Sequence, residues 1–265
     1  MIRGRTFLLV LLIFGVPSVT ALAGDEPVTL RVAAYNVEFS RSATPEQIGE
    51  MFKPFDLDVI GFNEAPDGDW TARVGKVLGM DFSYVGKISS ANHKNKFKTI
   101  LSRTPIEKTE EVLLKGRGWN PASAVKGVIR TEGMSITVFS LHICGSRKSD
   151  GHAHYLATEV LAKEPAGRVV VLGDFNNRIG DQALKYIEVA GMRPTWTDLK
   201  IDLTKQFTWN ALNPKKNEGV IDHIFYNASS GAEAKAGGII ELKTPLSDHK
   251  PVWAELVFPR TLPKR

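Results

Sequence analysis

The sequence predicts an α/β or α+β domain, in which mixed sheets carry helices on their outer faces. Three observations lead to this prediction: a helix pattern after the first strand, hairpin-like apolar pairs in the middle, and two later helical stripes. The 265 residues are 43% hydrophobic and 24% charged, which suits a globular protein with a full core. Because no repeat, low-complexity block or linker divides the chain, we expect one domain over residues 24–265.

The first 23 residues have the layout of a signal peptide. Two arginines precede the apolar run of residues 7–14, and the small residues Ala21 and Ala23 frame a cleavage site. A transmembrane helix needs about 20 apolar residues, and Pro17 would interrupt this one. We therefore expect cleavage near Ala23, export to the periplasm or the extracellular space, and no stable membrane anchor afterwards.

Charge and cysteine content narrow the possible partners. Cleavage would remove two arginines and no acid, so the formal net charge would fall by two, from +5 to +3. This mild balance suits an anionic substrate but not a broad face held to nucleic acid mainly through phosphates. Cys144 is the only cysteine, so no intrachain disulfide is possible. We expect a monomer that is stabilised by its core.

Alternating or β-branched apolar residues predict eight strands. They are residues 28–37, 57–64, 82–87, 98–102, 121–130, 134–143, 168–173 and 251–258.

Four segments have helical patterns. The first is marked by Thr44 as N-cap, Pro45 at the first helical position, and Gln47, which completes a capping box. The third and fourth carry apolar stripes at helical spacing. The other three predicted helices are residues 69–79, 150–163 and 183–190.

Polar side chains follow the ends of four strands. These are Asn36 and Glu38, Glu64, His142, and Asp174 with Asn176; the segments VIDHIFY and LSDHKPVW add Asp222, His223, Asp248 and His249. Asparagine and aspartate after a strand commonly make turns. However, burial of an acid such as Glu64 or Asp174 costs several kcal/mol unless a cation or hydrogen-bond donors compensate it. The combined pattern predicts a divalent cation.

The chemistry of the candidate ligands indicates which ion would bind. Asn36, Glu38, Glu64 and Asp248 offer hard oxygen atoms and no thiolate, which favours Mg²⁺, with Mn²⁺ or Ca²⁺ as alternatives. His142 and His249 then remain for proton transfer and charge stabilisation.

The ordered set AYNVE, FNE, SLH, GDFN, IDHIF and SDHKPVW resembles the endonuclease/exonuclease/phosphatase superfamily. Its members include deoxyribonuclease-I-like nucleases, abasic-site endonucleases, sphingomyelinases and inositol polyphosphate 5-phosphatases. The resemblance spans about residues 30–257. It implies a four-layer α-β-β-α sandwich of two mixed sheets with outer helices, in which the site lies where strand ends and loops converge.

The resemblance also implies roles in phosphoester hydrolysis, which needs an aimed water and cationic groups around the phosphoryl oxygens. Glu64 would be the principal metal ligand, with Asn36, Glu38 and Asp248 close to the ion directly or through water. Asp174 would orient or deprotonate the attacking water.

The amide and the imidazoles would then act on the substrate. Asn176 would donate a hydrogen bond to a phosphoryl oxygen. His249, kept protonated by Asp222, would donate to the phosphate. His142 would act similarly or protonate the leaving oxygen.

Other residues have less specific predictions. We expect His223 to be structural, His152 and His154 to lie on the surface, and Cys144 to be a small core or rim residue. An arginine that family members often carry near His152 and His154 is absent. The lysine-rich segment 86–98 would grip a polyanion or form a solvated flank.

Three further side chains are candidates for substrate contact. Trp119 and Trp209 would wall the pocket. Arg178 follows the GDxN motif by two positions, as in the phosphatase branch of the family, so it is a candidate contact for the substrate phosphate.

Three functions remain open from the sequence. The first is an exported metal-dependent phosphoesterase that hydrolyses a small-molecule or lipid phosphodiester or monoester by in-line water attack. The second is a secreted or periplasmic endonuclease or exonuclease that degrades DNA or RNA, and the third is a catalytically silent binding domain. Nothing in the sequence identifies the natural substrate.

Overall fold

The computed structural model describes residues 26–145, 151–165 and 167–263, and it contains two mixed sheets. The first sheet has the order β11-β12-β1-β2-β4-β3, made of β1 (Val28–Asn36), β2 (Val59–Ala65), β3 (Phe82–Val85), β4 (Phe97–Ser102), β11 (Glu233–Ile239) and β12 (Val252–Phe258). The second has the order β5-β6-β7-β8-β10-β9, made of β5 (Ile106–Leu114), β6 (Ala122–Thr131), β7 (Met134–His142), β8 (Val169–Asp174), β9 (Met192–Pro194) and β10 (Asp222–Asn227).

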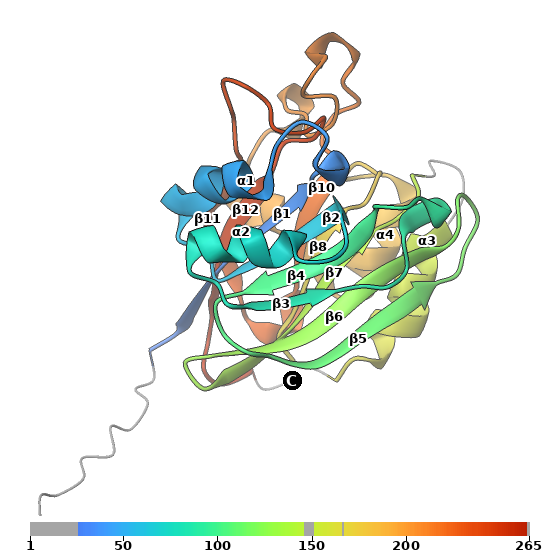
Figure 1. The fold of residues 1–265 in the computed structure, drawn as a ribbon. Coiled ribbons are helices and arrows are strands. Elements are labelled where there is room, and N and C mark those ends of the chain that lie inside the picture. Colours follow the sequence, from blue (N-terminus) through green and yellow to red (C-terminus); the bar gives the residue numbers. More distant parts are fainter. Residues whose placement is uncertain (1–25, 146–150, 166, 264–265) are drawn as a thin grey trace, which may run out of the picture.

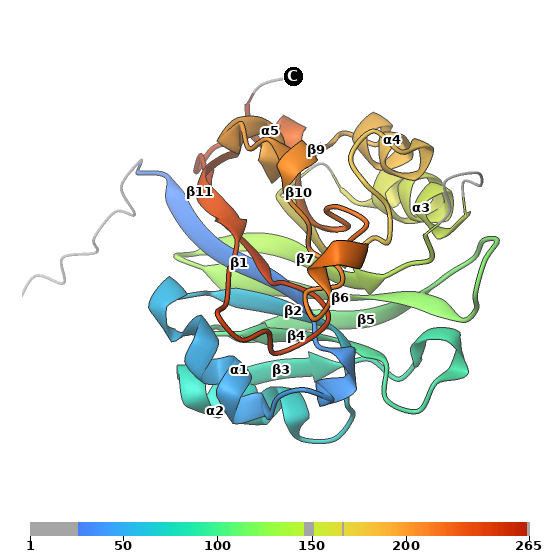
Figure 2. The same cartoon turned by 90° about the horizontal axis from the view of Figure 1, so that it is seen from above.

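Helices cover the outer faces of the two sheets (Figures 1 and 2). The helices α1 (Pro45–Phe52) and α2 (Trp70–Leu78) lie on the first sheet, and α3 (Gly151–Tyr155) and α4 (Gln182–Val189) lie on the second. This arrangement confirms the predicted four-layer sandwich. No helix among the described residues is long and apolar enough to cross a membrane. The predicted signal peptide lies outside the described residues.

All eight predicted strands are present, with ends that differ by one or two residues. The apolar run that begins at Asp222 forms β10, whereas β5, β9 and β11 were not predicted. β5 is an edge strand with a largely exposed surface, so its sequence carries five charged or polar residues and little apolar alternation. β11 contains alanine and glycine, which have low strand propensity, and it forms because β12 pairs with it.

The first predicted helix has the expected start. The Thr44 hydroxyl accepts the Gln47 backbone N–H at 3.3 Å, and the Gln47 side chain accepts the Thr44 backbone N–H at 2.9 Å. The third predicted helix is wrong as one continuous α-helix, because α3 continues as a π-helical turn at Leu156–Val160 and a 3₁₀ turn at Leu161–Lys163. Its apolar stripe is nevertheless buried, as the pattern required. The short helix α5 (Thr195–Leu199) was not predicted.

The main core fills the space between the sheets. It contains side chains from both inner faces, including Val32, Val59, Ile100, Val138 and Leu172. Gly61 in β2 faces the second sheet closely: a Cβ there would stand 2.0 Å from Leu172 Cδ1 and 2.7 Å from Ser140 Oγ. A methyl group has no room at this position, three residues before Glu64.

We therefore expect Gly61→Ala to lower the free energy of unfolding by about 1–3 kcal/mol, the usual cost of overpacking a filled core. Gly167→Ala is the matched control, because a Cβ at Gly167 meets its nearest neighbour at an ordinary 3.5 Å. Urea unfolding followed by tryptophan fluorescence measures both variants. Equal stability of the two variants would contradict the close approach of the sheets.

Candidate active site

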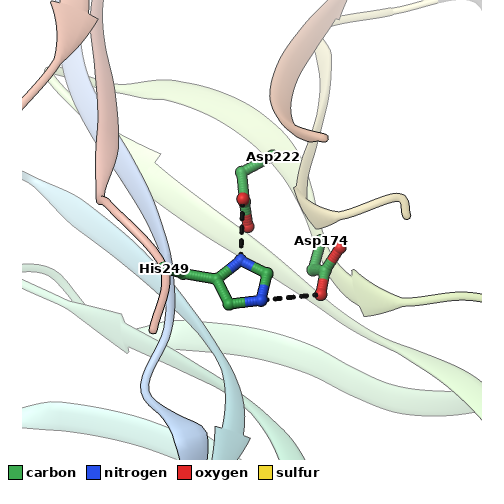
Figure 3. Close-up of side chains that lie close together, drawn as sticks. All are labelled: Asp174, Asp222 and His249. Atoms are coloured by element: carbon green, nitrogen blue, oxygen red, sulfur yellow. Dashed lines mark hydrogen bonds and ion pairs between the residues drawn. The ribbon is translucent and has the colours of Figure 1, made fainter. Parts of the chain in front are cut away.

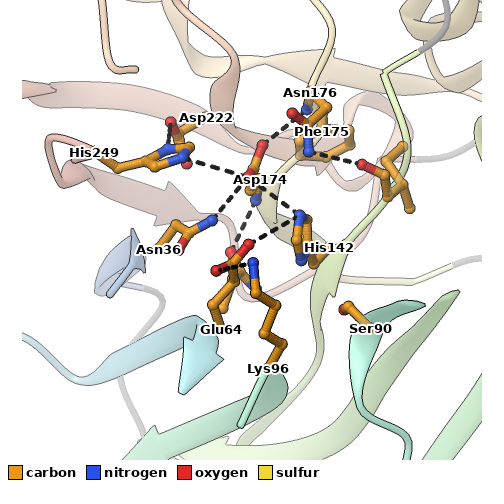
Figure 4. A network of polar contacts seen from close by, with 12 residues as sticks. Asn36, Glu64, Ser90, Lys96, His142, Asp174, Phe175, Asn176, Asp222 and His249 are labelled. Atoms are coloured by element: carbon orange, nitrogen blue, oxygen red, sulfur yellow. Dashed lines mark hydrogen bonds and ion pairs between the residues drawn. The ribbon is translucent and has the colours of Figure 1, made fainter. Parts of the chain in front are cut away.

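The predicted catalytic side chains come from strand ends that meet at one edge of the sandwich (Figure 4). Asn36 ends β1 and Glu64 lies near the end of β2, and these two strands are parallel. His142 ends β7 and pairs in register with Asp174 at the end of the parallel strand β8. Because the carboxyl ends of parallel strands point the same way, each sheet delivers two of these groups to the same side.

Asp174 lies at the centre of the polar network, and only 1% of it is exposed. Its Oδ2 accepts Asn36 Nδ2 at 2.9 Å, its Oδ1 accepts the Asn176 backbone N–H at 2.8 Å, and its own backbone N–H donates to Asn63 Oδ1 at 2.8 Å. Burial, followed by the nearby Asp222 carboxylate, raises the pKa of Asp174 to about 7. A carboxyl group with such a pKa is suited to exchange a proton near neutral pH.

His249 lies between two carboxylates (Figure 3). Its Nδ1 donates to Asp222 Oδ2 at 2.9 Å, and its Nε2 lies 3.7 Å from Asp174 Oδ2. Burial alone would lower the pKa of His249, but the charges of Asp222 and Asp174 outweigh burial and raise it to about 10. The imidazole is therefore a cation at neutral pH, as expected from its pairing with Asp222.

Two hydroxyl groups that the sequence did not single out hold this pair in place. Thr208 Oγ1 accepts the backbone N–H of Asp222 at 3.2 Å. Ser247 Oγ donates to the carbonyl of Asn36 at 2.8 Å and accepts the backbone N–H of His249 at 3.2 Å. The serine thereby ties the loop before β12 to the end of β1.

His142 faces the acids from the second sheet. Its Nε2 lies 3.5 Å from Asp174 Oδ2 and 3.8 Å from Glu64 Oε1. Burial, together with the positive charges of Lys98 and His249, holds the pKa of His142 well below its usual value. A neutral imidazole does not fit the predicted role as a charged donor and leaves proton transfer as the role to test. The Trp119 ring lies against His142 at a centroid distance of 4.9 Å, and its role as a pocket wall stays a prediction.

The acids predicted to hold a metal lie around the same centre. Glu64 is 8% exposed, and its Oε2 lies 2.7 Å from Lys96 Nζ. Glu38 pairs with Arg41 through Oε1, whereas its buried Oε2 has no hydrogen-bond partner among the described residues. Asp248 is half-buried, and its Oδ1 lies 3.2 Å from Ser247 Oγ.

A different group of three side chains could also hold a metal ion. Among the described residues, Asp174, Asp222 and His249 have ligand atoms that all lie within 4.8 Å of one another, and Glu38, Glu64 and Asp248 do not form a second such set. This trio is a candidate metal site. However, an ion could bind this trio only after His249 gave up its ring proton, and the carboxylates around Glu64 require no such exchange. The unpartnered oxygen of Glu38 and the oxygen-only chemistry of that set fit a hard divalent cation.

The three remaining residues that were predicted to contact the substrate are not all in the same part of the structure. The Asn176 side chain donates to the carbonyl of Ile143 at 3.0 Å, which leaves one amide hydrogen for another acceptor. Trp209 is half-buried, and its backbone pairs with that of His249. Arg178 instead lines a cavity of about 670 Å³, where its backbone N–H donates to Asp181. None of the predicted catalytic residues lines that cavity.

The other histidines have structural partners. His223 is fully buried, accepts Trp196 Nε1–H at 2.8 Å and contacts the carbonyl of Asn177 at 2.8 Å, as expected of a structural residue. The predicted surface position of His152 is wrong, because it is 1% exposed. His154 is half-buried and packs against Tyr186.

His152 is buried because a loop covers it. Its Nδ1 accepts the Cys144 backbone N–H at 3.1 Å, its Nε2 lies 3.2 Å from Asn120 Oδ1, and its ring contacts Trp119. A helical stripe reports only the side that faces the sheet, so it did not predict this contact. Cys144 is half-buried at the rim, in line with the prediction.

The lysine-rich segment divides into exposed and buried lysines. Lys87 and Lys94 are exposed, whereas Lys98 is fully buried and its ammonium donates to the carbonyl of Ile88. Burial lowers the pKa of Lys98 to about 8. Lys98 therefore belongs to the interior, and it is not part of a solvated flank.

Comparison with known proteins agrees with this geometry. The family model described as Endonuclease/Exonuclease/phosphatase family matches residues 33–249. No curated protein matches the chain. Among solved structures, a family protein from Bacteroides thetaiotaomicron has a TM-score of 0.71 at 21% identity, and the match covers 88% of this chain and 99% of that one.

Two further structures share the fold. A mannosyl-6-phosphatase from Bacteroides thetaiotaomicron has a TM-score of 0.67 at 21% identity, with 86% of this chain and 100% of that one covered. TDP2 from D. rerio, complexed with a single-strand DNA product, has a TM-score of 0.66 at 14% identity, with 86% and 98% covered. Since the family model spans most of the sequence, this chain belongs to the endonuclease/exonuclease/phosphatase family.

Proposed function

We propose that this protein is an exported, divalent-metal-dependent phosphoesterase that hydrolyses a small-molecule or lipid phosphate ester by in-line attack of water. The observation that carries the proposal is the buried contact set of Asp174, which brings Asn36, His142 and His249 around one carboxylate. Family membership supports phosphate-ester hydrolysis as the reaction class. If the network only stabilised the fold, it would not need a carboxyl group with a pKa of about 7 beside an imidazole that is protonated at neutral pH.

The protein groups divide the work as follows. Asp174 orients the attacking water and takes its proton, since its pKa of about 7 matches that task. The imidazolium of His249, held by Asp222, donates to a phosphoryl oxygen and offsets its developing charge. Asn176 donates its remaining amide hydrogen to the same group. Neutral His142 passes its ring N–H proton to the leaving oxygen and takes a replacement proton from water at its other ring nitrogen.

The cation has a defined place in this proposal. Glu64 would hold it, with Glu38, Asp248 and the amide of Asn36 nearby, and Mg²⁺ is the ion that such oxygen ligands favour, with Mn²⁺ or Ca²⁺ as substitutes. When bound, a divalent ion supplies Lewis-acid stabilisation of the phosphoryl oxygens. Arg178 lines a separate cavity, so we assign it no part in holding the ion.

A nuclease is the second candidate function. It is favoured by the shared fold with TDP2, whose structure contains single-strand DNA, and by the exposed lysines Lys87 and Lys94. Steeply salt-dependent hydrolysis of plasmid or single-stranded DNA would favour the nuclease, and activity confined to small esters would exclude it. If no phosphomonoester, phosphodiester, nucleic acid or sphingomyelin is hydrolysed with added metal, the silent binding domain is the better description.

Removal of either central group tests the catalytic assignment. We expect Asp174→Ala and His249→Ala each to lower kcat by about 10² to 10³ or more, the usual cost of a lost general base or oxyanion donor. Steady-state hydrolysis of the best ester from the panel measures the effect. Glu188→Gln, an exposed acid on α4, is the control for charge. A folded Asp174 or His249 variant that keeps half of the activity would remove that residue from the mechanism.

Metal removal tests the cofactor. We expect EDTA to abolish hydrolysis and Mg²⁺ or Mn²⁺ to restore it, because the ion would supply the Lewis-acid stabilisation of the phosphoryl oxygens. Glu64→Gln should raise the metal concentration needed for half-maximal activity by at least about ten-fold, the usual loss when a ligand interaction is weakened. Full activity in EDTA would rule out the metal-dependent mechanism.

Export is tested on the protein itself. We expect the form recovered from the periplasm or the medium to begin at Gly24, since cleavage is expected after Ala23. N-terminal sequencing or intact mass spectrometry of that fraction measures the start. A mature protein that retains Met1 would contradict the predicted signal peptide.

A further inference from the structure

Lys96 contributes a positive charge to the acidic centre from outside the strand ends that the sequence singled out (Figure 4). Its Nζ lies 2.7 Å from Glu64 Oε2, and the two side chains are only 22% and 11% exposed. The contact lies next to an irregularity between β2 and β4, where the pairing shifts between Phe62 and Ala65. Lys96 is the residue before β4, and Glu64 lies within the shifted stretch of β2.

The backbone of Lys96 is anchored, but its side chain has two environments within reach. The backbone N–H donates to Ser89 Oγ at 3.1 Å, and the carbonyl accepts the Ser90 N–H at 3.0 Å. The ammonium also lies 5.6 Å from the centroid of the Phe39 ring, close enough for a cation–π interaction. Rotation of the four-carbon side chain therefore changes the partner of the charge while the loop stays in place.

The Lys96 ammonium and a divalent ion would repel each other if both were bound to the Glu64 carboxylate. A buried carboxylate needs a compensating charge, and here Lys96 supplies it. A divalent ion bound to Glu64 would supply that charge instead and would repel the ammonium at short distance. We propose that Lys96 is the counterion of Glu64 that a divalent cation displaces, so that Lys96 sets the metal affinity of the site.

This inference rests on the proposed metal dependence, and it assigns Lys96 a positioning role. Displaced from Glu64, the ammonium keeps a favourable contact with the ring of Phe39, which is partly exposed beside the site. In the absence of the ion, the same lysine keeps the carboxylate of Glu64 compensated. Removal of Lys96 should therefore change metal binding and metal-free stability in opposite directions.

The test is Mn²⁺ binding to the purified protein, followed by electron paramagnetic resonance of free Mn²⁺ at constant ionic strength. We expect Lys96→Met to lower the Kd for Mn²⁺ by about five-fold, corresponding to the loss of one partly buried ion pair that opposes binding. Lys94→Met is the matched control, because it removes the same charge from an exposed position of the same loop. Its Kd should stay within about two-fold of wild type, since exposed charges are screened.

Charge and stability are measured separately from binding. Lys96→Arg keeps the charge beside Glu64, so its Kd should not fall. The melting temperature of Lys96→Met should be below wild type in EDTA and should equal wild type with saturating Mn²⁺. If Lys96→Met proves too unstable to purify, Lys96→Gln replaces it with the same expected outcomes.

The outcomes separate this inference from the proposed function. If Glu64→Gln weakens Mn²⁺ binding but Lys96→Met binds no more tightly than Lys94→Met, the metal site stands and the displacement of Lys96 is wrong. If wild type and Glu64→Gln bind Mn²⁺ equally, the ion is not at Glu64, and both the ligand assignment and the role of Lys96 are wrong. A lowered Kd in Lys96→Met alone supports displacement.

Discussion

The structure depends on the cost of burying one carboxylate. Asp174 is 1% exposed at the end of an apolar strand, and its charge can persist there only if nearby donors and cations compensate it. Among these groups, Asn36 comes from the first sheet, Asn176 follows β8, and His249 precedes β12. The donors thus come from both sheets. The contacts of Asp174 can therefore form only when the two sheets are packed in their correct alignment.

Three buried histidines show how the environment assigns different chemistry to the same side chain. His249 lies between Asp222 and Asp174, which raise its pKa to about 10 despite burial. His223 donates to a carbonyl and accepts from Trp196, and burial lowers its pKa to about 4. Burial, followed by the positive charges of Lys98 and His249, holds the pKa of His142 well below its usual value. Of the three, only His249 is protonated at neutral pH, and His249 is the histidine that we propose as the charged donor to the phosphate.

Much of the fold and most of the central residues were predictable because they follow from local patterns. Apolar strands that end in acids and amides marked Asn36, Glu64 and Asp174 before their contacts were known. The supporting residues were not predictable, because Thr208 and Ser247 act on backbone groups far away in sequence. Lys96 belongs to a lysine-rich segment, and its contact with Glu64 joins two segments that are far apart in sequence.

The incorrect predictions have similar causes. His152 was expected on the surface because its helix face points away from the sheet, but the loop of Trp119 and Asn120 covers it. The strand β11 has little intrinsic preference for extended structure and depends on β12. In each case, the environment of the residue or strand depends on a neighbour that is distant in sequence. The local sequence pattern cannot predict a contact with such a neighbour.

The segment 209–218 is closed at its base. The Thr208 backbone N–H donates to the carbonyl of Gly219 at 3.1 Å, and the Thr208 carbonyl accepts the backbone N–H of Lys250. The excursion above this base extends away from the sandwich (Figure 1). Because the entropy of closing a loop grows only slowly with its length, evolution can lengthen, shorten or exchange this excursion while the residues below it keep their positions. The segment 209–218 can therefore vary among proteins with this fold while the buried residues of the sandwich stay the same.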